Sequence, residues 1–245
     1  EVRDSNQQIR TPMAQRSAAH GEAGGEISRD EVPVVAPLVL EGRTLHHFAG
    51  FDFAVSPMRG GRTPELDDLD VLEWIGRFLA RIHTVGAAQP FTARPTLDLQ
   101  QFGTEPRDWL LEHALIPLDV QSAWREACNI ALDLIATSAY STSATGTFGL
   151  NNATQIRLHG DCHPGNILWT PDEGPHFVDL DDARMGPAVQ DLWMLLSGDA
   201  ETFAEERDAL MTGYTELRHF PMEQWAWIPL LRGLRILMYS GWIAT

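Results

Sequence analysis

The stretch HGDCHPGNILW, residues 159–169, followed by FVDLDD, residues 177–182, decides the fold of this 245-residue chain. Asp161 and Asn166 lie five residues apart across a loop that contains Gly and Pro. Asp179 follows eighteen residues after Asp161, at the end of an apolar, strand-like run. We therefore expect a loop between two strands that holds a carboxylate and a carboxamide toward one point, with a second carboxylate near it.

These three side chains predict a division of chemical labour. Asn166 and Asp179 supply hard oxygen atoms, which Mg²⁺ takes in proteins together with substrate phosphates. Asp161 then stays free to accept a proton from an attacking hydroxyl group. One Asp as base, with an Asn and a second Asp on the metal, is the arrangement of phosphoryl transfer of the protein-kinase type. The spacing predicts that Asp161 and Asp179 are catalytic and that Asn166 and Asp179 bind the metal.

Other chemistries use some of the same residues. A zinc site would use His159, Cys162, His163 and His176, but their spacing lacks the paired ligands of a structural zinc site. A two-metal phosphoesterase needs an upstream DxH and a later GHxH, and a serine hydrolase needs GxSxG; the sequence has none of these. His159 is better interpreted as a buried residue that positions the loop.

The charge balance restricts the partners. The chain carries 34 acidic and 18 basic residues, a net charge of −16, whereas a general nucleic-acid binder needs a surplus of basic side chains. All 18 basic residues are arginine, so no lysine can serve as a phosphate clamp. Cys128 and Cys162 form neither a CxxC pair nor a disulfide framework. Without a signal peptide or an apolar run of 18 residues, we expect a cytoplasmic protein with no membrane partner.

The hydrophobic pattern predicts a segregated α+β arrangement. Residues 1–30 are polar and are predicted to be a disordered or aberrant leader. Residues 31–62 contain short β-prone runs, interrupted at Glu41-Gly42 and at Gly50, which predict two or three antiparallel strands. Residues 63–245 are mostly helical, with apolar residues at helical spacing from 65 to 85 and in later segments, and with Pro229 as a candidate kink.

Two further features have both a functional and a plain interpretation. The backbone around Ser56 and Met58, in the connector after FDFAV, could bind an adenine edge with Met58 against the ring; an ordinary strand-to-helix turn is the alternative. Asp191, twelve residues after Asp179, either accepts backbone N–H groups of the catalytic loop or is a simple helix-terminal charge.

Residues 31 to about 243 resemble the stress response kinase A family of bacterial Ser/Thr protein kinases, within the aminoglycoside phosphotransferase and choline-kinase-like group. The resemblance rests on LHGDCHPGNILW (158–169) and FVDLDDARMGPAVQDLWMLLSGD (177–199) above all, and also on DEVPVVAP (30–37), GFDFAVSPMRGGR (50–62), GRFLARIH (76–83) and ARPTLDL (93–99).

The resemblance implies a two-lobed, protein-kinase-like fold that uses ATP and Mg²⁺. It implies Asp161 as proton acceptor, Asn166 and Asp179 as magnesium ligands, and residues 56–60 as the hinge, with Ser56 and Met58 at the nucleotide. In these terms residues 31–62 are remnant N-lobe strands and hinge, and residues 63–245 are the C-lobe. Family members phosphorylate protein Ser/Thr, so a cytoplasmic monomer is expected.

The start of the chain departs from the family pattern. A glycine-containing strand pair, a strand lysine and a helix Glu that pairs with it should precede DEVPVVAP, and residues 1–30 contain none of these. We therefore expect a gene fragment or a frame error that truncates the N-lobe. Two alternatives to a protein kinase stay open: a small-molecule phosphotransferase acting on an aminoglycoside, choline or homoserine, and a catalytically inactive kinase-like fragment.

Overall fold

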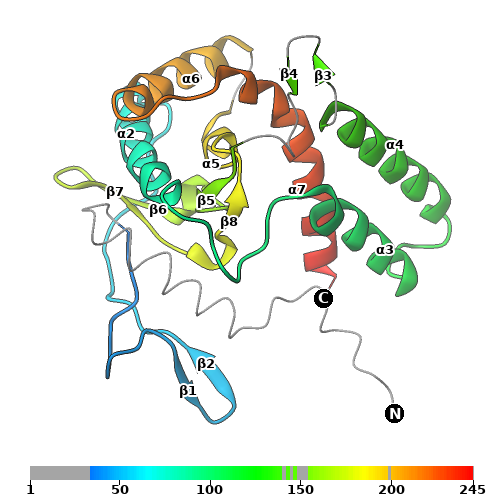
Figure 1. The fold of residues 1–245 in the computed structure, drawn as a ribbon, viewed down its shortest axis with the longest axis horizontal. Helices are drawn as coiled ribbons and strands as arrows, with labels where there is room; N and C mark the ends of the chain where they lie inside the picture. The colour runs from blue at the N-terminus through cyan, green and yellow to red at the C-terminus, as the bar shows by residue number, and fades with distance from the viewer. Residues whose placement is uncertain (1–33, 140–141, 144–145, 148–153, 198–199, 245) are drawn as a thin grey trace. The chain divides into compact units, whose positions relative to one another are not determined.

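The computed structural model describes residues 34–139, 142–143, 146–147, 154–197 and 200–244; the predicted leader lies outside these residues. Helices and strands alternate with 3₁₀ turns along the described chain (Figure 1). The strands are β1 (His46–Phe48), β2 (Phe51–Phe53), β3 (Thr142–Ser143), β4 (Gly146–Thr147), β5 (Ile156–Leu158), β6 (Ile167–Thr170), β7 (Gly174–Phe177) and β8 (Arg184–Gly186). The helices are α2 (Leu69–Gly86), α3 (Glu105–Glu112), α4 (Gln121–Ala139), α5 (Val189–Leu192), α6 (Ala200–Thr215) and α7 (Ile228–Ile243).

The chain divides into two compact units. We call the described residues of 34–95 and 155–224 the site unit, because it contains every residue predicted to be functional. We call the described residues of 96–154 and 225–244 the helical unit, because its main elements are α3, α4 and α7.

The core of the site unit is the contact between α2 and α6, which lie side by side (Figure 1). Helix α2 begins after Asp68, whose side chain accepts a hydrogen bond from the N–H of Asp70 at 3.0 Å, the interaction expected of an N-cap. Gly76 and Gly213 let the two backbones approach closely, since a Cβ on Gly76 would overlap the carbonyl oxygen of Leu210, and one on Gly213 that of Glu73. The helical spacing read from the sequence correctly predicted α2.

Two antiparallel strand pairs carry the motif residues. β5 pairs with β8, with Leu158 opposite Arg184, and β6 pairs with β7, with Ile167 opposite Phe177. The backbone of Arg62 exchanges hydrogen bonds with Trp169 of β6, at 3.0 and 2.7 Å, so the segment after the predicted hinge joins this pair at its edge.

The predicted breaks in the N-terminal strands are tight turns. Glu41 and Gly42 have φ of 52° and 77° between the bridged residues 40 and 43, and Ala49 and Gly50 have φ of 51° and 87° between β1 and β2. Two positive φ values in succession are typical of the turns that connect hairpin strands. The turn at Gly50 therefore connects a hairpin of two three-residue strands, β1 and β2, whereas the turn at Glu41-Gly42 closes only an isolated bridge between Leu40 and Arg43.

The helical unit differs from the sequence prediction at one point. Pro229 does not kink a helix: a 3₁₀ turn, Met222–Trp227, precedes α7, and Pro229 lies in the first turn of that helix. Proline is tolerated there because the N–H groups of a first turn have no partner within the helix. Cys128 and Leu132 of α4 pack with Leu237 of α7, each of them buried.

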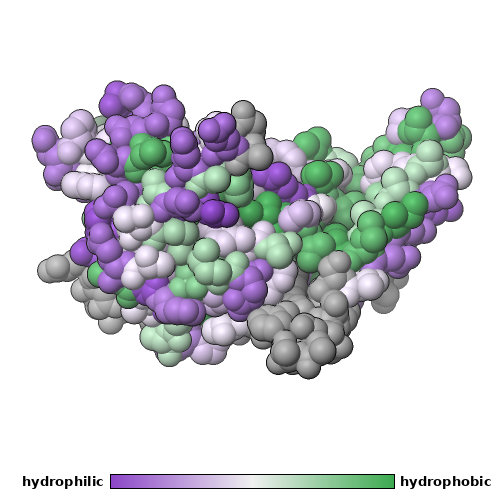
Figure 2. Space-filling model, turned by 90° about the horizontal axis from the view of Figure 1, so that it is seen from above, coloured by the Kyte–Doolittle hydropathy of each residue, from purple (hydrophilic) through white to green (hydrophobic). Residues whose placement is uncertain are grey.

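Apolar side chains are also exposed on this unit, among them Leu134 at 61% and Ile236 at 67%. Figure 2 shows apolar residues, in green, on parts of the molecular surface. No helix in the described part of the chain is long and apolar enough to cross a bilayer.

Replacing Gly213 by Ala should destabilise the protein by about 1–3 kcal/mol, because the new methyl group forces α6 away from the Glu73 carbonyl. Urea unfolding measures the change. Gly233→Ala on α7 is the control, since its Cβ meets only the end of the flexible Ile135 side chain; equal loss in both variants would contradict close helix packing at Gly213.

Candidate active site

The loop between β5 and β6 is shaped by residues 160–165 of the predicted motif. Gly160 has φ of +87°, and a Cβ there would overlap the carbonyl oxygen of Asp182, so a larger residue does not fit. The His163 ring accepts a hydrogen bond from the N–H of Gly165 at 3.0 Å, which caps the 3₁₀ turn Pro164–Asn166. The turn directs the chain from Asp161 to Asn166 and into β6.

A buried carboxylate anchors this loop. Asp191 of α5 is fully buried, and its two oxygens accept hydrogen bonds from the backbone N–H groups of His159 at 2.7 Å and of Gly160 at 2.8 Å. His83 Nε2 of α2 lies 3.1 Å from the same carboxylate, and His83 Nδ1 lies 2.9 Å from the hydroxyl of Tyr214 on α6. Of the two interpretations of Asp191, the structure confirms the one in which it accepts backbone N–H groups of the loop that carries Asp161.

The surroundings of Asp191 keep it charged. Burial raises the pKa of a carboxyl group, but the hydrogen bond and positive character of His83, with the N–H of Gly160, outweigh burial and hold the pKa of Asp191 below its ordinary value. An ionised carboxylate is the stronger acceptor for the loop N–H groups.

The other predicted loop residues have defined positions. His159 is buried, and its Nε2 lies 2.9 Å from the carbonyl oxygen of Val178, which confirms it as a positioning residue. Burial, followed by the charges of Asp191 and Asp161, raises the pKa of Cys162 well above its ordinary value. Among the described residues, no three His, Cys, Asp or Glu side chains are grouped so that they could hold a metal ion, so the structure does not support the zinc alternative.

Asp161 and Asn166 are tied together through the loop backbone. The side-chain Nδ2 of Asn166 donates to the carbonyl oxygen of Asp161 at 3.0 Å, so the amide oxygen Oδ1 faces the other way. Asn166 is 9% exposed, whereas the Asp161 carboxylate is half-buried, with one oxygen 3.6 Å from Nε2 of His163. Asp161 can therefore reach a substrate, and Asn166 keeps an oxygen atom for a cation.

The backbone next to Asp179 is hydrogen-bonded to the backbone of Asn166. The N–H of Val178 donates to the carbonyl oxygen of Asn166 at 3.0 Å, so the residue before Asp179 is bonded to the other predicted metal ligand. Asp179 has φ of 61° and ψ of 66°, a left-handed conformation that costs a non-glycine residue about 1–3 kcal/mol. Its side chain is exposed and, within the described residues, has no hydrogen bond. An exposed carboxylate on a strained backbone, without a hydrogen bond of its own among the described residues, is a candidate ligand for a hard cation such as Mg²⁺.

The hinge residues are also located by the structure. Ser56 and Met58 are exposed, Met58 at 99%, in the segment that runs from β2 to the bridge with β6. The next residue, Arg59, lies 2.7 Å from His176 Nε2 of β7 and forms an ion pair with Glu173. The connector is thus attached to the strand pair that follows Asn166, which leaves the nucleotide role of Ser56 and Met58 as a prediction.

Sequence reasoning missed four residues that support the site. His83 and Tyr214 complete the network around Asp191, and Arg94 and Arg184 bind the turn after Asp179. His83 and Arg94 lie in the segments GRFLARIH and ARPTLDL, which carried the resemblance but no assigned role. His83 could have been noticed in the sequence, because it is a polar residue on an otherwise apolar helix face.

The sequence pattern of the phosphotransferase enzyme family (APH) matches residues 12–228. The chain belongs to this family. It is 42% identical over 218 residues to stress response kinase A of Escherichia coli (strain K12), and 41% identical over 218 residues to the serine/threonine protein kinase RdoA of Salmonella typhimurium. Each alignment covers 89% of this chain and 63% of the relative, so the chain spans less than two thirds of these proteins.

Solved phosphotransferase structures share the fold. The amicoumacin kinase hAmiN, in complex with AMP-PNP, Ca²⁺ and Ami, has a TM-score of 0.72 at 16% identity, over 95% of this chain and 71% of that one. The aminoglycoside phosphotransferase APH(3'')-Id from Streptomyces rimosus has a TM-score of 0.60 at 18% identity, over 91% of this chain and 82% of that one. The predicted α+β, protein-kinase-like fold and the predicted resemblance are confirmed.

Replacing Asp191 by Asn should destabilise this phosphotransferase-family chain by about 3 kcal/mol at pH 7, because two loop N–H groups and His83 lose an ionised acceptor. Since the folded pKa of Asp191 is depressed, its contribution is fully present above about pH 4 and is lost as pH falls through the folded pKa. The difference in unfolding free energy between the unaltered chain and Asp191→Asn should therefore become smaller at acidic pH.

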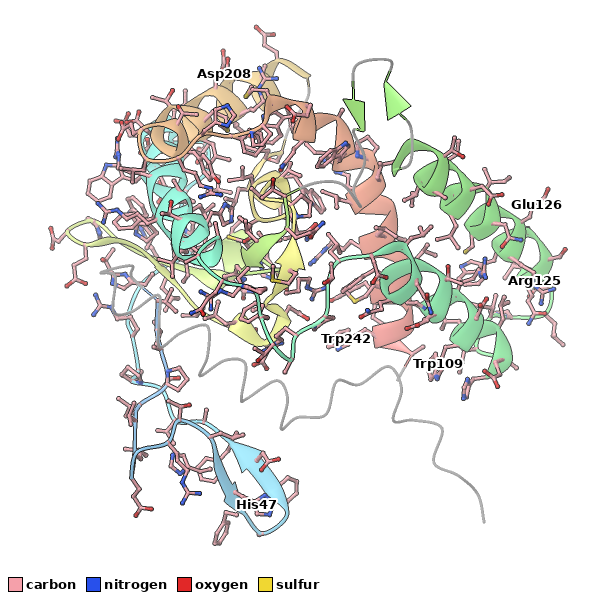
Figure 3. All side chains as sticks on the ribbon, viewed as in Figure 1. His47, Trp109, Arg125, Glu126, Asp208 and Trp242 are labelled. Atoms are coloured by element: carbon pink, nitrogen blue, oxygen red, sulfur yellow. The ribbon has the colours of Figure 1, made fainter. Side chains whose placement is uncertain are left out.

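Urea unfolding between pH 3 and pH 7 measures this gap. Asp208→Asn is the matched control, since Asp208 is exposed on α6 (Figure 3) and its carboxylate accepts hydrogen bonds from the neighbouring Arg207. A gap that is as wide at pH 3 as at pH 7 would contradict the role of the charge.

Proposed function

We propose that this chain is the catalytic part of an ATP-dependent Ser/Thr protein kinase, which transfers the γ-phosphate to a side-chain hydroxyl. The observation that carries the proposal is the loop that Asp191 fixes by hydrogen bonds. On this loop the Asn166 side chain donates a hydrogen bond to the backbone carbonyl of Asp161, and the carbonyl of Asn166 accepts one from Val178, the residue before Asp179. Identity of 41–42% to proteins named as stress response and serine/threonine kinases supports it.

In the proposed mechanism each residue has one task. The half-buried Asp161 carboxylate orients the acceptor hydroxyl and takes its proton as the hydroxyl oxygen bonds to the γ-phosphorus, while the bond from that phosphorus to the bridging oxygen breaks and ADP leaves. Asn166 and Asp179 would hold Mg²⁺, which neutralises charge on the phosphate oxygens when bound. Asp191 and His159 keep the loop rigid, so that Asp161 does not have to be reorganised during the reaction.

The nucleotide would lie against the connector at Ser56 and Met58. The exposed Met58 side chain offers an apolar surface for the adenine ring, and the backbone around Ser56 offers donors and acceptors for its edge. The proposal places the protein in the cytoplasm as a monomer, where ATP and protein acceptors are present. The proposal also assigns residues 31–62 to a remnant of the N-lobe and residues 63–245 to the C-lobe.

A small-molecule phosphotransferase is the second candidate. The net charge of −16 favours a cationic acceptor such as an aminoglycoside or choline over an anionic one. The absence of lysine from the whole sequence supports a third state, in which the chain keeps the fold without turnover.

Asp161→Asn should lower phosphate transfer from radiolabelled ATP by roughly 10²- to 10⁴-fold, because the amide cannot accept the hydroxyl proton. The melting temperature should change little, since the Asp161 carboxylate is half-buried and at the edge of the loop. Asp208→Asn again provides the control. Equal turnover in Asp161→Asn and the unaltered chain would refute the base assignment, and no turnover in the unaltered chain would favour the inactive fragment.

A comparison of acceptors separates the two enzyme candidates. A protein kinase should label the Ser and Thr residues of a generic protein acceptor and leave kanamycin, choline and homoserine unlabelled. Thin-layer separation and phosphoamino-acid analysis of the products distinguish the two outcomes. Label on a small alcohol alone would replace the protein-kinase proposal by the second candidate.

A further inference from the structure

The 3₁₀ turn directly after Asp179, Leu180–Asp182, is held by two arginines from different parts of the site unit. Arg94, in the segment after α2, donates through Nη2 to the carbonyl oxygen of Leu180 at 3.3 Å and through Nη1 to that of Asp181. Arg184, on β8, donates through Nε to the carbonyl oxygen of Asp182 at 2.6 Å. Each carbonyl oxygen of the turn therefore accepts a hydrogen bond from a guanidinium group.

The backbone segments that carry the two arginines are hydrogen-bonded to each other. The N–H of Met185, next to Arg184, donates to the carbonyl oxygen of Pro95, next to Arg94, at 3.0 Å. Arg184 is 5% exposed, and its Nη2 also donates to the Asp182 carboxylate at 2.8 Å. The two guanidinium groups thus form one rigid support for the turn.

The same support touches the loop of the proposed base. A Cβ placed on Gly160 would lie 2.9 Å from Nε of Arg184 and would overlap the carbonyl oxygen of Asp182. The turn after Asp179 and the residue before Asp161 are therefore in direct contact. Any movement of the turn changes the position of Asp179 relative to Asp161.

Electrostatics and strain both require such a support. Asp179, Asp181 and Asp182 put three carboxylates into four residues, and like charges at this spacing repel one another. Asp179 also holds a left-handed backbone that persists only where its surroundings impose it. A guanidinium fork donates to two carbonyl oxygens at once, which a single ammonium cannot do with the same geometry.

We propose that Arg94 and Arg184 are positioning residues that hold the Leu180–Asp182 turn, and through it the Asp179 carboxylate, against the Asp161 loop. The proposal rests on the proposed function insofar as Asp179 is the metal ligand. It assigns the arginine of the ARPTLDL segment to the cation site, where it acts through backbone carbonyls and contacts neither nucleotide nor acceptor. Loss of Arg94 should weaken cation binding and loosen the turn while the rest of the fold stays intact.

Arg94→Gln and Arg94→Lys test the proposal in the full chain. Hydrogen exchange followed by mass spectrometry reports on peptides that contain residues 178–186 and needs no metal. Binding of Mn²⁺ in the presence of AMP-PNP, followed by electron paramagnetic resonance, reports on the cation site. Arg207→Gln is the matched control, because it removes one positive charge from α6, where the Arg207 guanidinium donates its hydrogen bonds to the carboxylate of Asp208. Asp179→Asn is the reference for loss of the metal ligand.

We expect faster exchange of the turn in Arg94→Gln and a Mn²⁺ dissociation constant raised by about 10- to 100-fold, the usual effect of losing a residue that orients a metal ligand. Arg94→Lys should restore part of the binding, since it keeps the charge but not the fork, and Arg207→Gln should match the unaltered chain. Exchange across α2 and α6 should be unchanged in every variant.

Two results would overturn the proposal. Unaltered exchange at the turn in Arg94→Gln would show that the arginine does not hold it, and unaltered Mn²⁺ binding in that variant would show that Asp179 does not depend on it. If Asp179→Asn weakens Mn²⁺ binding and Arg94→Gln does not, only the positioning role fails. If Asp179→Asn binds Mn²⁺ as well as the unaltered chain does, or the unaltered chain binds none, the proposed function fails as well.

Discussion

The buried carboxylate of Asp191 is the constraint on which the site unit depends. A charge without solvent is tolerated only with close polar partners, and Asp191 obtains them from two loop N–H groups and from His83. Because His83 is on α2 and its other nitrogen meets Tyr214 on α6, satisfying one charge fixes the catalytic loop to both central helices. The close contact of these helices at Gly76 and Gly213 is therefore also a condition for the shape of the site.

Starting from Asp191, a series of hydrogen bonds to backbone groups fixes the positions of the other site residues. Asp191 holds the N–H groups before Asp161, the Asn166 side chain holds the Asp161 carbonyl, and the Val178 N–H holds the Asn166 carbonyl. None of these three bonds uses a carboxylate oxygen of Asp161 or Asp179, the residues proposed as base and metal ligand. Backbone bonding fixes the direction of each side chain without using its functional atoms, which is the preorganisation that phosphoryl transfer requires.

Local patterns were sufficient for the parts of the molecule that local chemistry determines. Helix α2 followed from apolar spacing, the tight turns followed from Glu41-Gly42 and Gly50, and the loop that joins β5 to β6 followed from the Gly and Pro between Asp161 and Asn166. The partners of Asp191 could not be found in this way, because His83 is 108 residues distant in the chain and Tyr214 is 131 residues from His83. A polar residue on an apolar face indicates a buried partner but does not identify it, and the same limit applied to Arg94.

The arginines explain why the missing lysine matters so much for this chain. Arg94, Arg157 and Arg184 donate to the backbone carbonyl oxygens of residues 180, 85 and 182, and Arg59 is paired with Glu173. Each of these cations already stabilises the site unit, so using one to bind a phosphate would remove a support of the loops that it holds. A cation held by Asn166 and Asp179, as proposed, would supply positive charge to the phosphate oxygens without using these arginines. In that proposal the position of Asp179, and with it the arginine support of its turn, would decide how firmly the cation is held.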